Sequence, residues 1–118
     1  MKYLRSFNES VNELETFCKN YLAELVDMGC HINVRFINTK ISNLSHYIFT
    51  LRSDDALRWI DINDIFIPFL QMLSESYSIG GRITFRNNMG SSLATYDDVL
   101  NGKVDLFLIR EIKFDIDF

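Results

Sequence analysis

The chain has 118 residues, is 47% hydrophobic and carries a formal net charge of −4. That length fits one domain, residues 1–118, and it can bury a core without the support of a metal or a disulfide. The acidic balance argues against a non-specific nucleic-acid binder, which needs a surplus of Lys and Arg, and no apolar run reaches the 18 or so residues of a membrane span.

The first predicted element is a helix over about residues 9–28. Its apolar residues recur at spacings of three and four, which places them on one helical face; they are Leu4, Phe7, Val11, Leu14, Cys18, Tyr21, Leu25 and Met28. Gly29 is placed to end the helix. The spacing also suits a coiled-coil seam, but Phe17, Leu22 and Val26 widen the face, and a wide face favours packing on a sheet.

Two predicted strands follow as an antiparallel hairpin. In "HINVRFIN", Ile32, Val34 and Phe36 alternate with residues of the other face, which is the period of a strand. "NTKISN" is a turn, and "SHYIFTLRS" then places Tyr47, Phe49 and Leu51 on one face.

The stretch "WIDINDIFIPFLQML" is predicted to be a helix over about residues 62–77, buried on most sides. Asp61 and Asp64 resemble an N-terminal capping pattern. Pro68 lacks a backbone N–H, so either the helix bends there or it begins nearer Ile65, with Pro68 in its first turn.

The rest of the chain predicts two further strands and a helical turn. Gly80 and Gly81 turn into a strand with Ile83 and Phe85 inward, "NNMGSS" is a loop, and "LATYDDVLNG" is a short helical turn that Gly102 closes. The last strand alternates, and its apolar face, with Arg110 as the exception, comprises Val104, Leu106, Leu108, Ile112, Phe114, Ile116 and Phe118. Phe107 and Ile109 make its first half apolar on both faces, as in a central strand.

This order, α-β-β-α-β-(α)-β, predicts an α+β fold: a two-layer sandwich with a mainly antiparallel sheet and two helices on one face. The expected chemistry is sparse. His31 and His46 do not have the spacing of metal ligands, and two thiols, Cys18 and Cys30, do not make a disulfide framework. Acid pairs such as Asp54–Asp55 and Asp97–Asp98 read first as turn or cap residues. We therefore expect no enzyme, metal or cofactor, and a reduced intracellular setting.

Six arginines lie in or beside predicted strands. Arg82 and Arg86 share a face, so they could bind an acidic or nucleic-acid partner, unless each pairs with an acid of the chain itself. The last strand is a second candidate for partner binding, with the residues Arg110, Ile112, Phe114, Ile116 and Phe118. Its apolar face needs a cover, either the first helix of the same chain or another subunit that adds an edge strand or a groove.

The start "MKYLRSFNES" has the form K-x-L-x-S-F-N-E, and with the later "W-x-D-I-x-D-I-F-I-P-F-L" it resembles small uncharacterised proteins of bacteriophages and of marine bacterial and viral genomes. The resemblance implies a phage protein in the host cytoplasm or the virion, and no activity. The favoured function is a non-enzymatic protein–protein interaction module, either a virion or assembly component or an inhibitor of a host defence protein. The alternatives are a homo-oligomer, a nucleic-acid-associated accessory protein using the sheet arginines, and a small enzyme with scattered acids.

Overall fold

An antiparallel sheet, to which the described residues contribute six strands, forms one layer of the molecule. The computed structural model describes residues 7–39, 44–80, 82–87, 89–102 and 108–117. The strands are β1 (Cys30–Thr39), β2 (Leu44–Arg58), β3 (Ser78–Ile79), β4 (Ile83–Asn87), β5 (Gly90–Ala94) and β6 (Leu108–Asp117). Their order in space is β1-β2-β6-β4-β5, and the short β3 pairs with the end of β6. The last strand of the chain is therefore central.

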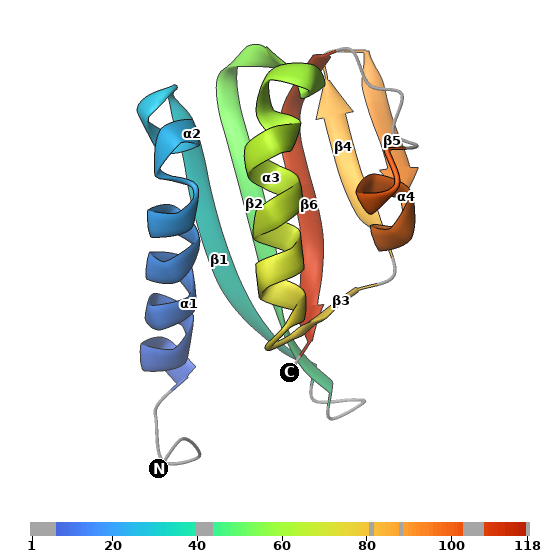
Figure 1. The fold of residues 1–118 in the computed structure, drawn as a ribbon. Helices are drawn as coiled ribbons and strands as arrows, with labels where there is room; N and C mark the ends of the chain where they lie inside the picture. The colour runs from blue at the N-terminus through green and yellow to red at the C-terminus, as the bar shows by residue number, and fades with distance from the viewer. Residues whose placement is uncertain (1–6, 40–43, 81, 88, 103–107, 118) are drawn as a thin grey trace.

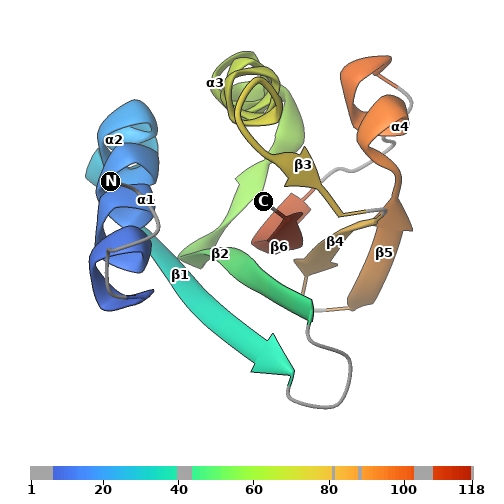
Figure 2. The same ribbon diagram turned by 90° about the horizontal axis from the view of Figure 1, so that it is seen from below.

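The described residues form four helices, which make up the second layer: α1 (Phe7–Tyr21), α2 (Ala23–Asp27), α3 (Trp59–Ser74) and α4 (Tyr96–Leu100). All four lie on the same face of the sheet, with α1 and α2 over β1, α3 near the middle and α4 near β5 (Figure 1, Figure 2). The predicted α+β class with a mainly antiparallel sheet is confirmed; the first expected helix is divided into α1 and α2, and the expected helical turn is α4.

The predicted first helix is divided at Leu22 into α1 and α2. Leu14, Cys18, Leu22 and Leu25 are buried in the main core, so this face packs within the chain, as the width of the stripe indicated. Two members of the predicted stripe are wrong: Tyr21 and Met28 are 36% and 50% exposed. Because the helix is broken at Leu22, the buried position falls on Leu22 and not on Tyr21. Gly29 ends the element at a positive φ of 97°, as predicted.

The hairpin of β1 and β2 pairs Cys30 with Ser53 at one end and Thr39 with Leu44 at the other. On its other side β2 pairs with β6, and the register shifts between Arg52 and Leu57. Arg52 pairs with Glu111 and Leu57 pairs with Ile109, so β6 has only one residue, Arg110, between these two pairs. Such a bulge reverses which side chains face the core. Ile109 is therefore buried and Leu108 is 39% exposed, which corrects the prediction that Leu108 lies on the apolar face.

The helix α3 begins at Trp59, three residues before the predicted start, so Pro68 lies in its interior and not in its first turn. Asp61 does not cap the helix. Its carboxylate accepts a hydrogen bond of 2.9 Å from Nε of Arg58, the N-cap residue. The buried face of α3 consists of Trp59, Ile62, Phe66, Phe69, Leu70 and Leu73.

Two strands, β3 and β5, were not predicted. The segment "NNMGSS" is only in part a loop, because β5 begins at Gly90 and pairs with β4. Its small polar residues carry no alternation that marks a strand. The helical turn is confirmed as α4, which has a capping box between Thr95 and Asp98 and is followed by Gly102 at a φ of 71°.

Aromatic rings hold the two layers together. The ring centroid of Phe49 on β2 lies 4.7 Å from the centroid of Phe114 on β6 and 5.3 Å from the centroid of Phe69 on α3. Trp59 contacts Phe85 of β4 at 5.4 Å between centroids. The core therefore lies between the helices and one face of the sheet, and the opposite face stays outside it.

Candidate functional site

The face of the sheet that points away from the helices is bare among the described residues (Figure 2). We call it the open face and define it by the residues of the paired strands that alternate with those on the helix-facing side. They are His31, Asn33, Arg35 and Ile37 of β1; His46, Ile48, Thr50 and Arg52 of β2; Glu111, Lys113, Asp115 and Asp117 of β6; Thr84 and Arg86 of β4, with Arg82 just before it; and Ser91 and Leu93 of β5. None of these residues is buried.

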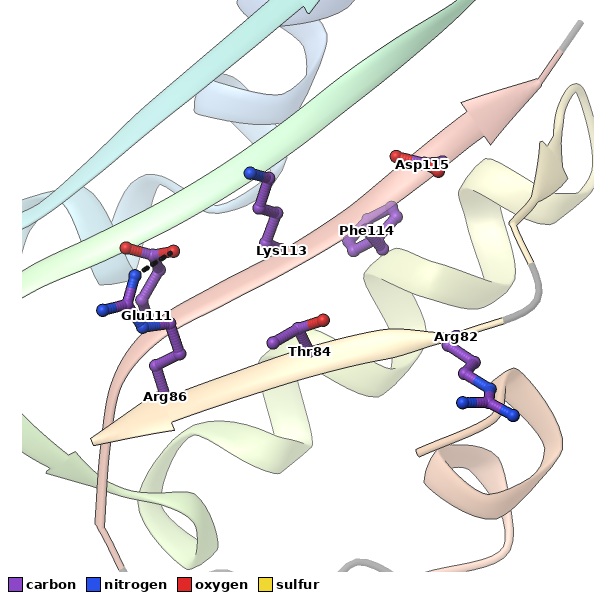
Figure 3. Close-up of a pocket in the computed structure, with 7 residues that line it drawn as sticks. All are labelled: Arg82, Thr84, Arg86, Glu111, Lys113, Phe114 and Asp115. Atoms are coloured by element: carbon purple, nitrogen blue, oxygen red, sulfur yellow. Dashed lines mark ion pairs between the residues drawn. The ribbon is translucent and has the colours of Figure 1, made fainter. Parts of the chain in front are cut away.

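The strand order brings two arginines to one carboxylate. Glu111 of β6 stands opposite Arg52 of β2 on one side and Arg86 of β4 on the other. Nη2 of Arg52 lies 3.4 Å from Oε2 of Glu111, and Nη1 of Arg86 lies 3.7 Å from Oε1 (Figure 3). The Glu111 side chain is only 12% exposed, whereas both guanidinium groups extend into solvent. One carboxylate thus serves two cations.

Lys113 lies in the next row, between two hydroxyls. It is paired across the strands with Thr50 on one side and Thr84 on the other. No carboxylate of the described ranges lies within ion-pair distance of its ammonium group, and the same holds for Arg82. These cations and their neighbours line an open groove of about 310 Å³ between β4 and β6, with Arg82, Thr84, Arg86, Glu111, Lys113, Phe114 and Asp115 (Figure 3).

The charge of the open face is opposite in sign to that of the whole chain. Its described residues include five cations, Arg35, Arg52, Arg82, Arg86 and Lys113, against the three carboxylates Glu111, Asp115 and Asp117. Asp54 lies at the rim, 3.5 Å from Nε2 of His31. The chain as a whole has a net charge of −4. The acids are therefore concentrated elsewhere, and this face offers cations to a partner.

The predicted site residues separate into three groups. Arg82 and Arg86 lie on the open face and line the groove. Ile112, Phe114 and Ile116 are buried in the chain's own core, covered by α3 and not by the first helix alone. Both edges of β6 are paired, with β2 on one side and with β4 and β3 on the other, so it has no edge to offer a partner strand. These three residues therefore belong to the core and not to an accessible binding surface.

The remaining two predicted site residues are Arg110 and Phe118. Arg110 is half-buried at the bulge, and its Nε is buried with no hydrogen-bond partner among the described residues. Phe118 lies outside the described residues. Glu111 and Lys113 were not predicted as site residues, and Arg52 was predicted only as one of the six strand arginines. Alternation places them on the outer face, but only the strand order makes them neighbours.

The described chain offers little for covalent or metal chemistry. It holds no group of three or more His, Cys, Asp and Glu side chains placed to bind a metal. Both cysteines are free and buried. Burial raises the pKa of Cys18 to about 12, and the nearby charge of Glu15 adds to that rise, which disfavours the thiolate that a nucleophile needs.

No helix within the described ranges is both long and apolar enough to cross a membrane. Comparison with protein-family models, with curated proteins and with solved structures finds no match to the chain.

Proposed function

We propose that the chain is a non-enzymatic interaction module that binds another protein through the open face of its sheet. The observation that carries the proposal is a bare sheet face whose cations oppose the net charge of the chain. Most sheets of this kind keep one solvated face that is polar and mixed in charge. Here the central strands bring together Arg52, Arg86 and Lys113, which is the composition that charge-steered recognition uses.

A nucleic-acid partner is the second candidate, because arginines on a sheet also suit phosphates. Two observations favour a protein. The open face presents no Phe, Tyr or Trp side chain among its described residues, and stacking on such rings carries much of single-strand binding. The net charge of −4 also argues against a non-specific nucleic-acid binder, which neutralises many phosphates with a surplus of Lys and Arg.

The biological setting of the proposal comes from the resemblance of the chain's start to phage-encoded proteins. In that setting the module acts in the bacterial host cytoplasm or in the virion. Its partner is then a component of the virion or its assembly, or a host defence protein that it inhibits. These two roles share the same requirement for a protein-binding face.

Site-specific photocrosslinking tests the proposal. A benzophenone amino acid replaces Arg35 on the open face in one variant and Ile60, which is exposed on α3, in the matched control. Both proteins are irradiated in cells of the natural source, with and without nuclease treatment of the extract. We expect a defined protein adduct from position 35 that resists nuclease, and none from position 60.

Adducts that form only at position 60 would place the binding surface on the helix layer and contradict the proposal. Adducts at position 35 that disappear with nuclease would favour the nucleic-acid alternative. An adduct of twice the chain mass would identify the partner as a second copy.

A further inference from the structure

The open face already holds one carboxylate in contact with two arginines. We infer that Arg52, Arg86 and Lys113 form a site for an acidic protein segment. Glu111 then occupies, between the two arginines, the position that an acidic side chain of the partner would take. The inference rests on the proposed function, because it names the partner chemistry of the same face. It concerns which groups bind, not whether the face binds.

The arginines retain unused hydrogen-bonding capacity. A guanidinium group has five N–H donors and can hold a carboxylate through two parallel hydrogen bonds. Arg52 donates a single long hydrogen bond of 3.4 Å to Glu111, and the 3.7 Å between Arg86 and Glu111 exceeds a hydrogen bond. Glu111 lies on the floor of the groove while the two arginine side chains stand in solvent. A second carboxylate can therefore approach them from outside.

Lys113 provides a further cation in the adjoining row. Its ammonium group has no carboxylate partner among the described side chains, and the hydroxyls of Thr50 and Thr84 flank it across the strands. The groove of about 310 Å³ beside it is open to solvent and lies along β4 and β6 (Figure 3). Side chains of an extended segment can enter such a groove without a change in the fold.

Asp115 argues for a peptide and against a continuous polyphosphate. It lines the same groove, and its carboxylate repels any ligand that carries a negative charge at every step. A peptide can place acids opposite Arg52, Arg86 and Lys113 and a neutral or basic residue opposite Asp115. The occupant is therefore an acidic segment of a protein with its charges interrupted.

Fluorescence anisotropy with a labelled ten-residue peptide of alternating Glu and Ser, at low ionic strength, tests the inference. Lys113→Gln should weaken binding about threefold, the effect of one exposed ion pair. Glu111→Gln should tighten binding by about the same factor, because it frees two guanidinium groups from their internal partner. The matched controls are Lys19→Gln on α1 and Glu24→Gln on α2, which change the net charge equally and should match the parent protein.

Three results would overturn the inference. Weaker binding by Glu111→Gln, with circular dichroism unchanged, would make Glu111 the residue that positions the arginines and not a competitor. Control variants that shift affinity as much as the site variants would reduce the effect to net charge. Tighter binding of a thymidine oligonucleotide of equal charge would assign the site to phosphates. In the first two cases the crosslink at position 35 would still form, so the inference would fail while the proposed function would hold.

Discussion

Single buried residues show how little of the core is available for chemistry. Cys18 is the clearest case, because its thiol lies in the core between α1 and the sheet. Its environment disfavours the thiolate, and Cys30 has a raised pKa for the same reason, burial, which a hydrogen bond with Ser53 partly offsets. Both thiols are structural side chains.

The Cys18 thiol makes the free energy of unfolding depend on pH in alkali. Its pKa is about 12 in the folded state against an ordinary value of 9.0, so the unfolded state loses its proton first. The contribution is complete below pH 9.0 and is lost as the pH rises toward 12. Urea titrations at pH 8 and pH 10.5 should show a decline that is smaller in Cys18→Ala. An equal decline in both proteins would mean that the thiol is solvated.

Phe69 tests the packing of α3 on the sheet. Its ring lies within 6 Å of the rings of Tyr21, Phe49 and Phe66, and the side chain is fully buried. Phe69→Ala should lower the free energy of unfolding by about 3–5 kcal/mol, the usual range for emptying a buried Phe site. Phe17→Ala, on the partly exposed side of α1, is the control and should cost much less. Equal losses in the two variants would contradict the described core.

At the level of secondary-structure elements, the first helix protects the edge of the sheet at β1. The outer edge of β1 is covered by α1, where the backbone N–H of Val34 donates a 3.0 Å hydrogen bond to Oε2 of Glu15. Lys19 also pairs with Glu15 at 3.0 Å. A free edge strand invites pairing with another chain, and this contact occupies one of its donors.

Removal of the Glu15 carboxylate should therefore expose the edge of β1. Glu15→Ala should cost about 1 kcal/mol and increase self-association, measured by sedimentation, with Glu24→Ala as the control. Partial burial alone would raise the pKa of Glu15, but the hydrogen bond from Val34 and the pairing with Lys19 lower it below 4.5. Its contribution is complete above pH 4.5 and is lost as the pH falls through the lower folded value. A Glu15→Ala protein with the parent's acid sensitivity would contradict this assignment.

The elements also show what the sequence could and could not predict. Alternation correctly placed Ile32, Val34, Ile83 and Phe85 inward, because a two-residue period requires no knowledge of the partner strand. The bulge at Arg110 was missed because it depends on how β2 pairs with β6. The strand β5 was missed because Gly90, Ser91 and Ser92 have low strand propensity and form a strand only beside β4.

The candidate site was predictable only in part for the same reason. Arg82 and Arg86 share a face by their spacing along one strand, and this holds in the structure. Their relation to Arg52 and Glu111 depends on the order β2-β6-β4, which brings together residues far apart in the sequence. A pairing that connects the last strand to the first hairpin has no local signal.

At the level of the whole molecule, the two faces of the sheet have different environments. Aromatic and aliphatic side chains from the helices and from one face of the sheet form the core. The other face is bare, mixed in charge and richer in cations than the acidic chain that carries it. The central claim is that this open face is where the chain meets its partner.

The most direct measurement is a map of amide chemical shifts during titration with the alternating Glu–Ser peptide. We predict that the perturbed amides cluster at Arg52, Thr84, Arg86 and Lys113, with those of α1 and α3 unchanged. The shifts should fade as salt is added, because the contacts are between exposed charges. Perturbations that centre on the helix layer, or spread evenly over the molecule, would contradict the claim.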